Sequence, residues 1–150
     1  MSFQERNIAV SLGNFSLILV FYLFRLWQLI GSERFELNQI FRLWLIIIVA
    51  SIVVTIVATI LTHIGAGIME AIKTKAKPVI QDITDERDKL IDLKGTKTTY
   101  TFSSIGTFLA MLTFALGQPP LVMFTLLILF GLLAQIVGDG VRLYFYRRGV

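Results

Sequence analysis

The chain has 150 residues, of which 55% are hydrophobic and 16% are charged, and it contains no cysteine. The missing cysteines exclude disulfides, thiolate metal sites and iron–sulfur clusters. The formal net charge of +4 lies beside apolar segments, where anionic lipid headgroups are the expected partner and nucleic acid is not.

Long stretches without any charged residue dominate the chain, and they cover residues 7–24, 43–69 and 98–138. A helix needs about 20 mostly apolar residues to cross a hydrocarbon core of about 30 Å, so the third stretch is long enough for two crossings. We therefore predict four spans, at residues 8–30, 42–65, 98–117 and 120–138. A mean hydropathy of +0.76 leaves no room for a separate soluble domain, so residues 1–150 form one membrane domain.

Short connections set how the spans pair. Pro119 and Pro120 cannot continue a helix, so the third span is expected to end near Gly117 and to turn tightly into the fourth. The short connection at residues 32–36 joins the first two spans. Because short connections force neighbouring helices to be antiparallel, the predicted fold is an all-α integral membrane protein of two antiparallel helical hairpins.

Basic residues predict the orientation. They gather in the connection 66–97 and after the fourth span, at Lys73, Lys75, Lys77, Arg87, Lys89, Lys94, Lys97, Arg142, Arg147 and Arg148. Since basic residues in short loops are retained in the cytoplasm, the N terminus, the C terminus and this connection are expected to be cytoplasmic. Anionic lipids at that face are the expected lipid partners.

The connection 66–97 contains the most distinctive polar sequence. Thr84 or Asp85 as a cap, acids in the first turn and Lys94 near the end predict a short amphipathic helix on the membrane surface. Gly95 is expected to mark a bend into the third span. The run Asp85-Glu86-Arg87-Asp88 is predicted to dock a cytoplasmic partner, although such runs more often mark a solvated helix start.

Two short motifs carry a resemblance to known proteins. The segment I-T-D-E-R-D-K-L-I-D-L-K-G at residues 83–95 and the ending Y-R-R-G at residues 146–149 resemble a loose group of small uncharacterised bacterial inner-membrane proteins, as does the start M-S-F-Q-E. The resemblance implies a four-span protein of the bacterial cytoplasmic membrane and brings no established activity with it. Some members of that group lie beside small helix-turn-helix regulators, which favours a regulatory or stress-related role.

Polar residues in the second span form a stripe at helical spacing, made of Ser51, Thr55, Thr59 and Thr62. Such a stripe can line a conduction path, but Ser and Thr more often bond their own helix and allow close packing. Small residues at four-residue spacing, Gly106 and Ala110 in the third span and Ala134 and Gly138 in the fourth, predict helix contact faces.

Ionisable residues at the end of the fourth span suggest a second transport feature. Gln135, Asp139 and Arg142 follow one another at i+4 and i+3. An intramembrane carboxylate suggests a site for a cation or a proton. The glycines on either side of Asp139 favour a structural interpretation instead, in which the helix ends there and Arg142 neutralises Asp139 locally.

His63 is the only histidine and lies near the cytoplasmic end of the second span. It could ligate a haem or a chlorophyll-type pigment, but an interfacial histidine bonded to a neighbouring helix is the more common case. Zinc is not expected, because Glu70 is the only nearby carboxylate and a zinc site wants three or four protein ligands.

No phosphate loop, nucleophile elbow or HExxH pattern is present, so catalysis and a bound cofactor are not expected. We predict a non-enzymatic protein that acts through protein–protein interaction, as an accessory subunit, a homo-oligomer or the membrane partner of a cytoplasmic regulator. A small transporter or channel is the alternative, and a pigment- or haem-binding subunit is a second one. Four-span multidrug exporters are similar in size but depend on a glutamate in the first span, where this chain has Asn14.

Overall fold

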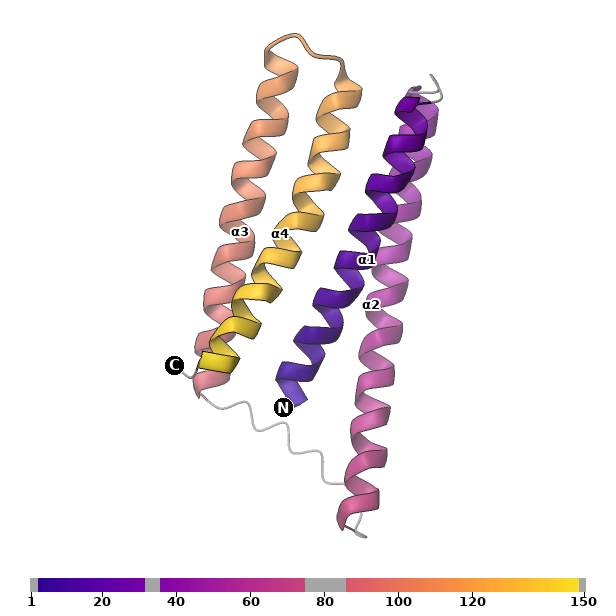
Figure 1. Cartoon of the computed structure of the whole chain (residues 1–150). Helices are drawn as coiled ribbons and strands as arrows, with labels where there is room; N and C mark the ends of the chain where they lie inside the picture. Colours follow the sequence, from indigo (N-terminus) through magenta and orange to yellow (C-terminus); the bar gives the residue numbers. More distant parts are fainter. Residues whose placement is uncertain (1–2, 32–35, 75–85, 149–150) are drawn as a thin grey trace.

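A computed structural model describes residues 3–31, 36–74 and 86–148, and this part of the chain forms four α-helices (Figure 1). They are α1 (Phe3–Gly31), α2 (Leu37–Thr74), α3 (Glu86–Ala115) and α4 (Pro120–Arg148). Helix α1 begins and α4 ends at one end of the molecule, which we name the termini end (Figure 1). The end of α1, the start of α2 and the α3–α4 connection lie at the opposite end, the loop end, so helices adjacent in sequence run antiparallel.

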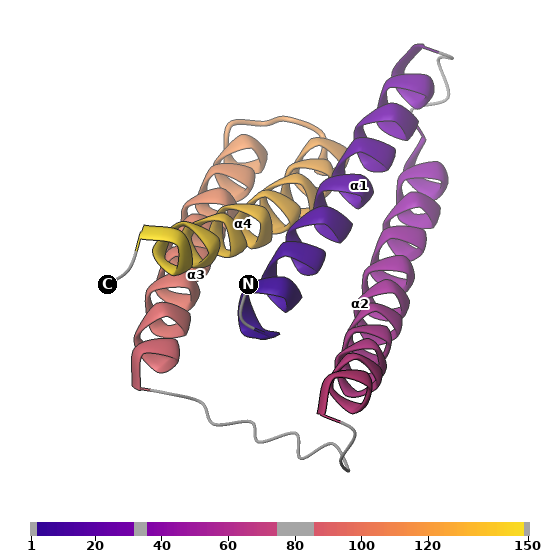
Figure 2. The ribbon, with the colours of Figure 1, turned by 60° about the horizontal axis from the view of Figure 1, so that its bottom comes forward.

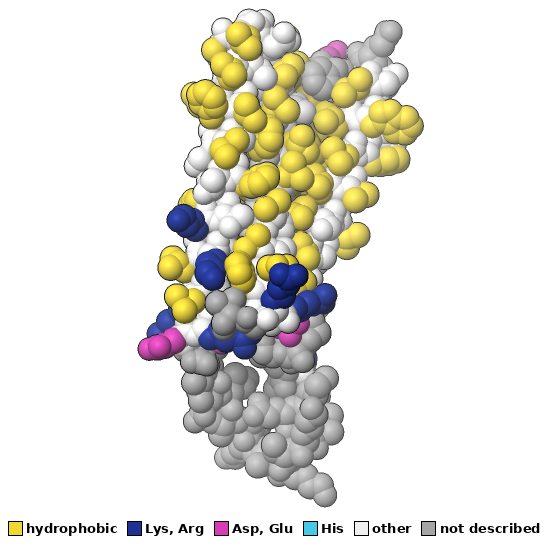
Figure 3. Space-filling view, turned by 60° about the vertical axis from the view of Figure 1, so that its left-hand side comes forward, with side chains coloured by type: hydrophobic (Ala, Val, Ile, Leu, Met, Phe, Trp, Pro, Cys, Tyr) yellow, Lys and Arg dark blue, Asp and Glu magenta, His cyan; other side chains and the backbone are white. Residues whose placement is uncertain are grey.

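Within the described residues, three helices are long and apolar enough to cross a membrane, namely α1, α2 and α4. Helix α3 is less apolar because its first half is charged and its second half, from Thr98 to Ala115, is rich in Thr and Ser. Leu17, Trp27 and Phe108 each expose more than 60% of their surface. Figure 3 shows apolar side chains over most of one face, with Lys and Arg nearer the termini end. Such a surface suits contact with lipid.

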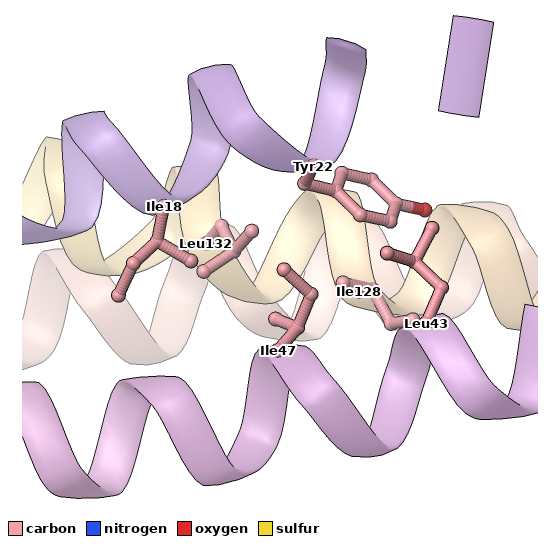
Figure 4. Close-up of a cluster of buried hydrophobic side chains, with 6 residues drawn as sticks. All are labelled: Ile18, Tyr22, Leu43, Ile47, Ile128 and Leu132. Atoms are coloured by element: carbon pink, nitrogen blue, oxygen red, sulfur yellow. The ribbon is translucent and has the colours of Figure 1, made fainter. Parts of the chain in front are cut away.

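The helices form an open arrangement with α1 and α4 in contact at its centre (Figure 2). Helix α2 packs on α1, and α3 packs on α4. Apolar side chains of α1, α2 and α4 point toward one another in a buried cluster (Figure 4): Ile18, Tyr22, Leu43, Ile47, Ile128 and Leu132. The Tyr22 hydroxyl donates a hydrogen bond of 2.8 Å to the carbonyl oxygen of Thr125. This cluster holds the two hairpins together.

The α3–α4 contact depends on small residues. Gly106, Ala110, Ala134 and Gly138 are all buried, which confirms the predicted helix contact faces. A Cβ atom at Gly106 would overlap the Phe130 side chain, and one at Gly138 would overlap Thr99. The small residues let the two helix backbones approach closely, which increases the van der Waals contact between them.

Two predicted breaks in the helices are wrong. Helix α3 runs from Glu86 through Gly95 without a bend, so residues 86–94 are its first turns and not a separate surface helix. Helix α4 likewise continues past Gly138 and Gly140 to Arg148. A glycine within a helix weakens it without necessarily ending it, and at Gly95 and Gly138 a neighbouring helix or side chain leaves no space for a Cβ atom.

The predicted helix end near Gly117 is confirmed. Helix α3 ends at Ala115, and Gly117 adopts a left-handed conformation with φ of 84°. The Gln118 amide donates to the Thr113 carbonyl at 3.0 Å and the Gly117 amide donates to the Phe114 carbonyl at 3.0 Å. This is the Schellman pattern, in which glycine relieves the clash that a Cβ would cause. Pro120 then occupies the first position of α4, where its missing N–H is harmless.

Replacing Gly138 with alanine is expected to destabilise the α3–α4 hairpin by about 1–3 kcal/mol, because the added methyl group overlaps Thr99 and lies 3.3 Å from the Gly95 carbonyl oxygen. Gly140→Ala is the matched control, since Gly140 is on the same helix and has no atom within 4 Å of such a methyl group. Alanine there should be neutral or stabilising by up to about 1 kcal/mol. Thermal unfolding in detergent, followed by circular dichroism, measures the difference; equal midpoints would contradict the close packing.

Candidate functional site

A polar cavity of about 500 Å³ lies at the termini end, between all four helices. Its polar lining residues are Gln4, Asn7, Ser11 and Asn14 of α1, Thr55 and Thr59 of α2, Asp88, Lys89 and Asp92 of α3, and Gln135, Asp139, Arg142 and Tyr146 of α4. Ile8, Val10, Ala58 and Ile91 provide apolar walls. A cavity of this size is large enough for a small molecule, and it combines polar groups from all four helices with apolar walls.

Asp139 is the buried charge of the cavity, with only 3% of its surface exposed. The Ser11 hydroxyl donates to its Oδ2 at 2.6 Å, and the Arg142 guanidinium donates to its Oδ1 at 2.9 Å. The Gln135 amide lies further away, at 3.4 Å from Oδ1. A buried carboxylate needs such partners, because an unpaired ion out of water is very unfavourable.

Arg142 links α4 to α3. Besides its contact with Asp139, its Nε donates to Asp92 Oδ1 at 2.9 Å and its Nη2 donates to Thr96 Oγ1 at 2.8 Å. The Arg142 side chain passes directly over Gly95, where a Cβ would lie 2.6 Å from Nε. Gly95 therefore provides the space in which this guanidinium reaches both carboxylates.

The structure brings together four of the five residues predicted for transport. Thr55, Thr59, Gln135 and Asp139 all line the cavity. Ser51 does not line it, and its hydroxyl donates to the Ile47 carbonyl of the same helix at 2.7 Å. Thr59 makes a similar bond to the Thr55 carbonyl at 2.8 Å. Intrahelical bonding and a cavity-lining position thus occur together at Thr59.

The polar face of α1 is the part of the cavity that the sequence analysis does not predict. Gln4, Asn7, Ser11 and Asn14 recur at three- and four-residue spacing, so they lie on one side of the helix. Because the surrounding run is uncharged and apolar on average, hydropathy marks it only as a span. The helical period of its few polar residues is the signal that would find this face.

The predicted docking run lies at the start of α3. Asp85 is outside the described residues, and Glu86 and Arg87 are exposed. Asp88 Oδ1 accepts a hydrogen bond of 2.7 Å from the Tyr146 hydroxyl, and Arg87 Nη2 lies 3.4 Å from the Tyr146 carbonyl oxygen. Two side chains of the run therefore join the start of α3 to the end of α4.

The predicted cofactor ligand, His63, belongs to α2, but its side chain lies outside the described residues. Among the described residues, no three His, Asp or Glu side chains are grouped so that they could hold a metal ion together.

Comparisons with protein-family models, with curated proteins and with solved structures found no match to this chain.

Proposed function

We propose that the chain is a four-span protein of the bacterial cytoplasmic membrane, with both termini in the cytoplasm. The uncharged part of α3 from Thr98 to Ala115 is about 27 Å long at 1.5 Å per residue, which is close to the thickness of a hydrocarbon core. Its Thr and Ser hydroxyls bond back to their own helix, as Thr98 and Thr101 do, which lowers the penalty of placing them in lipid. The basic residues near the termini end support the orientation, and the resemblance of the residue 83–95 segment supports the bacterial compartment.

Within this topology we propose that the protein is a small transporter. The observation that carries the proposal is Asp139, a nearly fully buried carboxylate on the wall of a cavity that all four helices line. Asp139 lies about 28 Å from the start of α4, and Thr55 about 27 Å from the start of α2, so the two residues are at a similar depth. Ionisable residues inside a membrane protein mark ion and substrate pathways by default.

Packing alone explains the cavity poorly. A purely structural ion pair would be enclosed by apolar side chains, whereas the lining residues around Asp139 and Arg142 include the side chains of Asn7, Asn14 and Gln135. The Asn7 and Asn14 amides in this lining favour a water-filled site that a solute can enter.

An interaction role, as an accessory subunit or a homo-oligomer, remains a prediction, as does a pigment site at His63. The transporter is the better supported role because the predicted docking run uses Asp88 and Arg87 within the chain itself. Four of the predicted transport residues, in contrast, share one cavity.

A thiol-labelling experiment tests the proposed function, since the chain has no cysteine of its own. Thr55→Cys places a single thiol in the cavity, and Val57→Cys, two residues away, places one on the lipid-exposed face at nearly the same depth. A membrane-impermeant maleimide is added to vesicles of either orientation. Because only a thiolate reacts, a thiol in hydrocarbon should be labelled at least about 10-fold more slowly than one in water.

A transporter exposes its site to each side of the membrane in turn. We therefore expect Thr55→Cys to react from the termini side and, more slowly, from the loop side, while Val57→Cys reacts from neither. Reaction of Thr55→Cys from the termini side alone would show a static vestibule and overturn transport. If Thr55→Cys reacts from neither side, the cavity holds no water.

A further inference from the structure

The fixed charges of the cavity favour a cationic ligand. Three carboxylates and two cations line it, a formal net charge of −1. Arg142 is committed to the protein, because three of its N–H donors already point at Asp92, Asp139 and Thr96. The guanidinium is therefore a poor site for an anion. Asp92, whose side chain is 71% exposed, adds an accessible carboxylate at the rim of the cavity.

The cavity also extends between α2 and α3. Thr55, Ala58 and Thr59 of α2 and Ile91 of α3 all line it, yet in the described part of the chain α2 and α3 make almost no contact with each other. Figure 2 shows α2 and α3 standing apart on either side of α1 and α4. In the described part of the chain, this side of the cavity is therefore not closed by a contact between two helices.

Exposed apolar side chains lie close to the lining residues in the sequences of α2 and α3. On α3, Leu90 and Leu93 expose 53% and 64% of their surface, and on α2, Leu61 exposes 63%. Such apolar side chains do not stabilise the binding of a small hydrated ion. A molecule with an apolar body and one positive charge is stabilised by both features, because its body contacts apolar side chains while its charge lies near carboxylates.

We propose that the cavity binds amphiphilic monovalent cations, with the charged group near Asp139 and Asp92 and the apolar body between α2 and α3. This inference rests on the proposed function, since it names the substrate class of the same cavity. Asp139 lies deepest, so it attracts the charge inward, and Asp92 meets it first at the rim.

Two probes of nearly equal size and opposite charge test the proposal. Tetraphenylphosphonium and tetraphenylborate are each equilibrated with the pure protein in lipid nanodiscs, and binding to empty nanodiscs is subtracted. We expect one saturable tetraphenylphosphonium site per chain and binding of tetraphenylborate that is at least about 10-fold weaker. Saturable binding of both probes with equal affinity would show apolar partition and overturn the charge selection, and no saturable tetraphenylphosphonium site would overturn the proposal.

Variants locate the site. Asp139→Asn should weaken tetraphenylphosphonium binding by about 10-fold or more, whereas Glu36→Gln removes an exposed carboxylate at the loop end and should leave it unchanged. Asp92→Asn repeats the test at an exposed position with less risk to folding.

Ala58→Trp should block the part of the cavity between α2 and α3, with Val57→Trp on the outer face as its control. Unchanged binding in both Asp139→Asn and Asp92→Asn would overturn the site, and unchanged binding in Ala58→Trp would overturn the position of the apolar body.

The outcomes separate this inference from the proposed function. If Thr55→Cys reacts from both sides but tetraphenylphosphonium does not bind, transport stands and the substrate class is wrong. If tetraphenylphosphonium binds and Asp139→Asn abolishes binding, while Thr55→Cys reacts from one side only, the cation site stands and transport is wrong.

Discussion

Replacing Arg142 with methionine is expected to lower the free energy of unfolding by about 3–5 kcal/mol, because the change leaves the Asp139 carboxylate buried without a counter-charge. Methionine keeps most of the volume of the arginine stem over Gly95, so the loss reports charge and hydrogen bonding more than packing. The same change frees Asp92 and Thr96 of α3 from their shared donor. Thermal unfolding in detergent, followed by circular dichroism, measures the loss.

A second substitution separates two contributions to stability: the buried Asp139 charge, and the bonds that Arg142 makes from α4 to α3. In the double variant Arg142→Met with Asp139→Asn, the amide at position 139 is neutral and Ser11 still has a bonding partner, so at least half of the lost stability should return. Arg148→Met, at the exposed end of the same helix beside the Tyr144 ring, should change stability by no more than about 0.5 kcal/mol. A double variant as unstable as Arg142→Met alone would show that Asp139 is stable without its cation.

Much of the fold could be predicted from local signals. Two prolines and Gly117 set the end of α3 whatever surrounds them, and long uncharged runs mark three apolar helices. The course of α3 through Gly95 and of α4 through Gly138 could not be predicted, because the reason for each glycine lies in another helix. The sequence alone does not distinguish a glycine that ends a helix from one that leaves space for the Arg142 side chain.

The candidate site shows the same division. The contact between Asp139 and Arg142 follows from their i,i+3 spacing on one helix, and the structure confirms it at 2.9 Å. The partners Asp92 and Ser11 could not be predicted, since 50 and 128 residues separate them from the groups they bond. These long-range contacts place the Asp139–Arg142 pair in the wall of a cavity, which the spacing of the two residues on one helix does not predict.

Replacing Tyr22 with alanine is expected to destabilise the protein by about 3–5 kcal/mol, through the cavity it leaves in the apolar cluster and the lost bond to Thr125. Tyr22 is 1% exposed and lies in one buried cluster with Leu43 of α2 and Ile128 of α4 (Figure 4). Tyr22→Phe removes the hydroxyl alone and should account for about 1 kcal/mol of the loss. Phe21→Ala, beside it on the outer face with 44% exposure, should have a small effect on thermal unfolding.

The Tyr22 variant also connects stability with access to the cavity. The apolar cluster lies between the cavity and the loop end, so in a transporter it is the barrier that closes the path from that side. In a Tyr22→Ala background, Thr55→Cys should therefore react faster from the loop side, by about 10-fold if water enters the space left by the ring. A protein that loses stability while loop-side labelling stays unchanged would place the barrier elsewhere. A Phe21→Ala background controls for general loosening of α1, because the Phe21 ring faces outward and leaves the cluster intact.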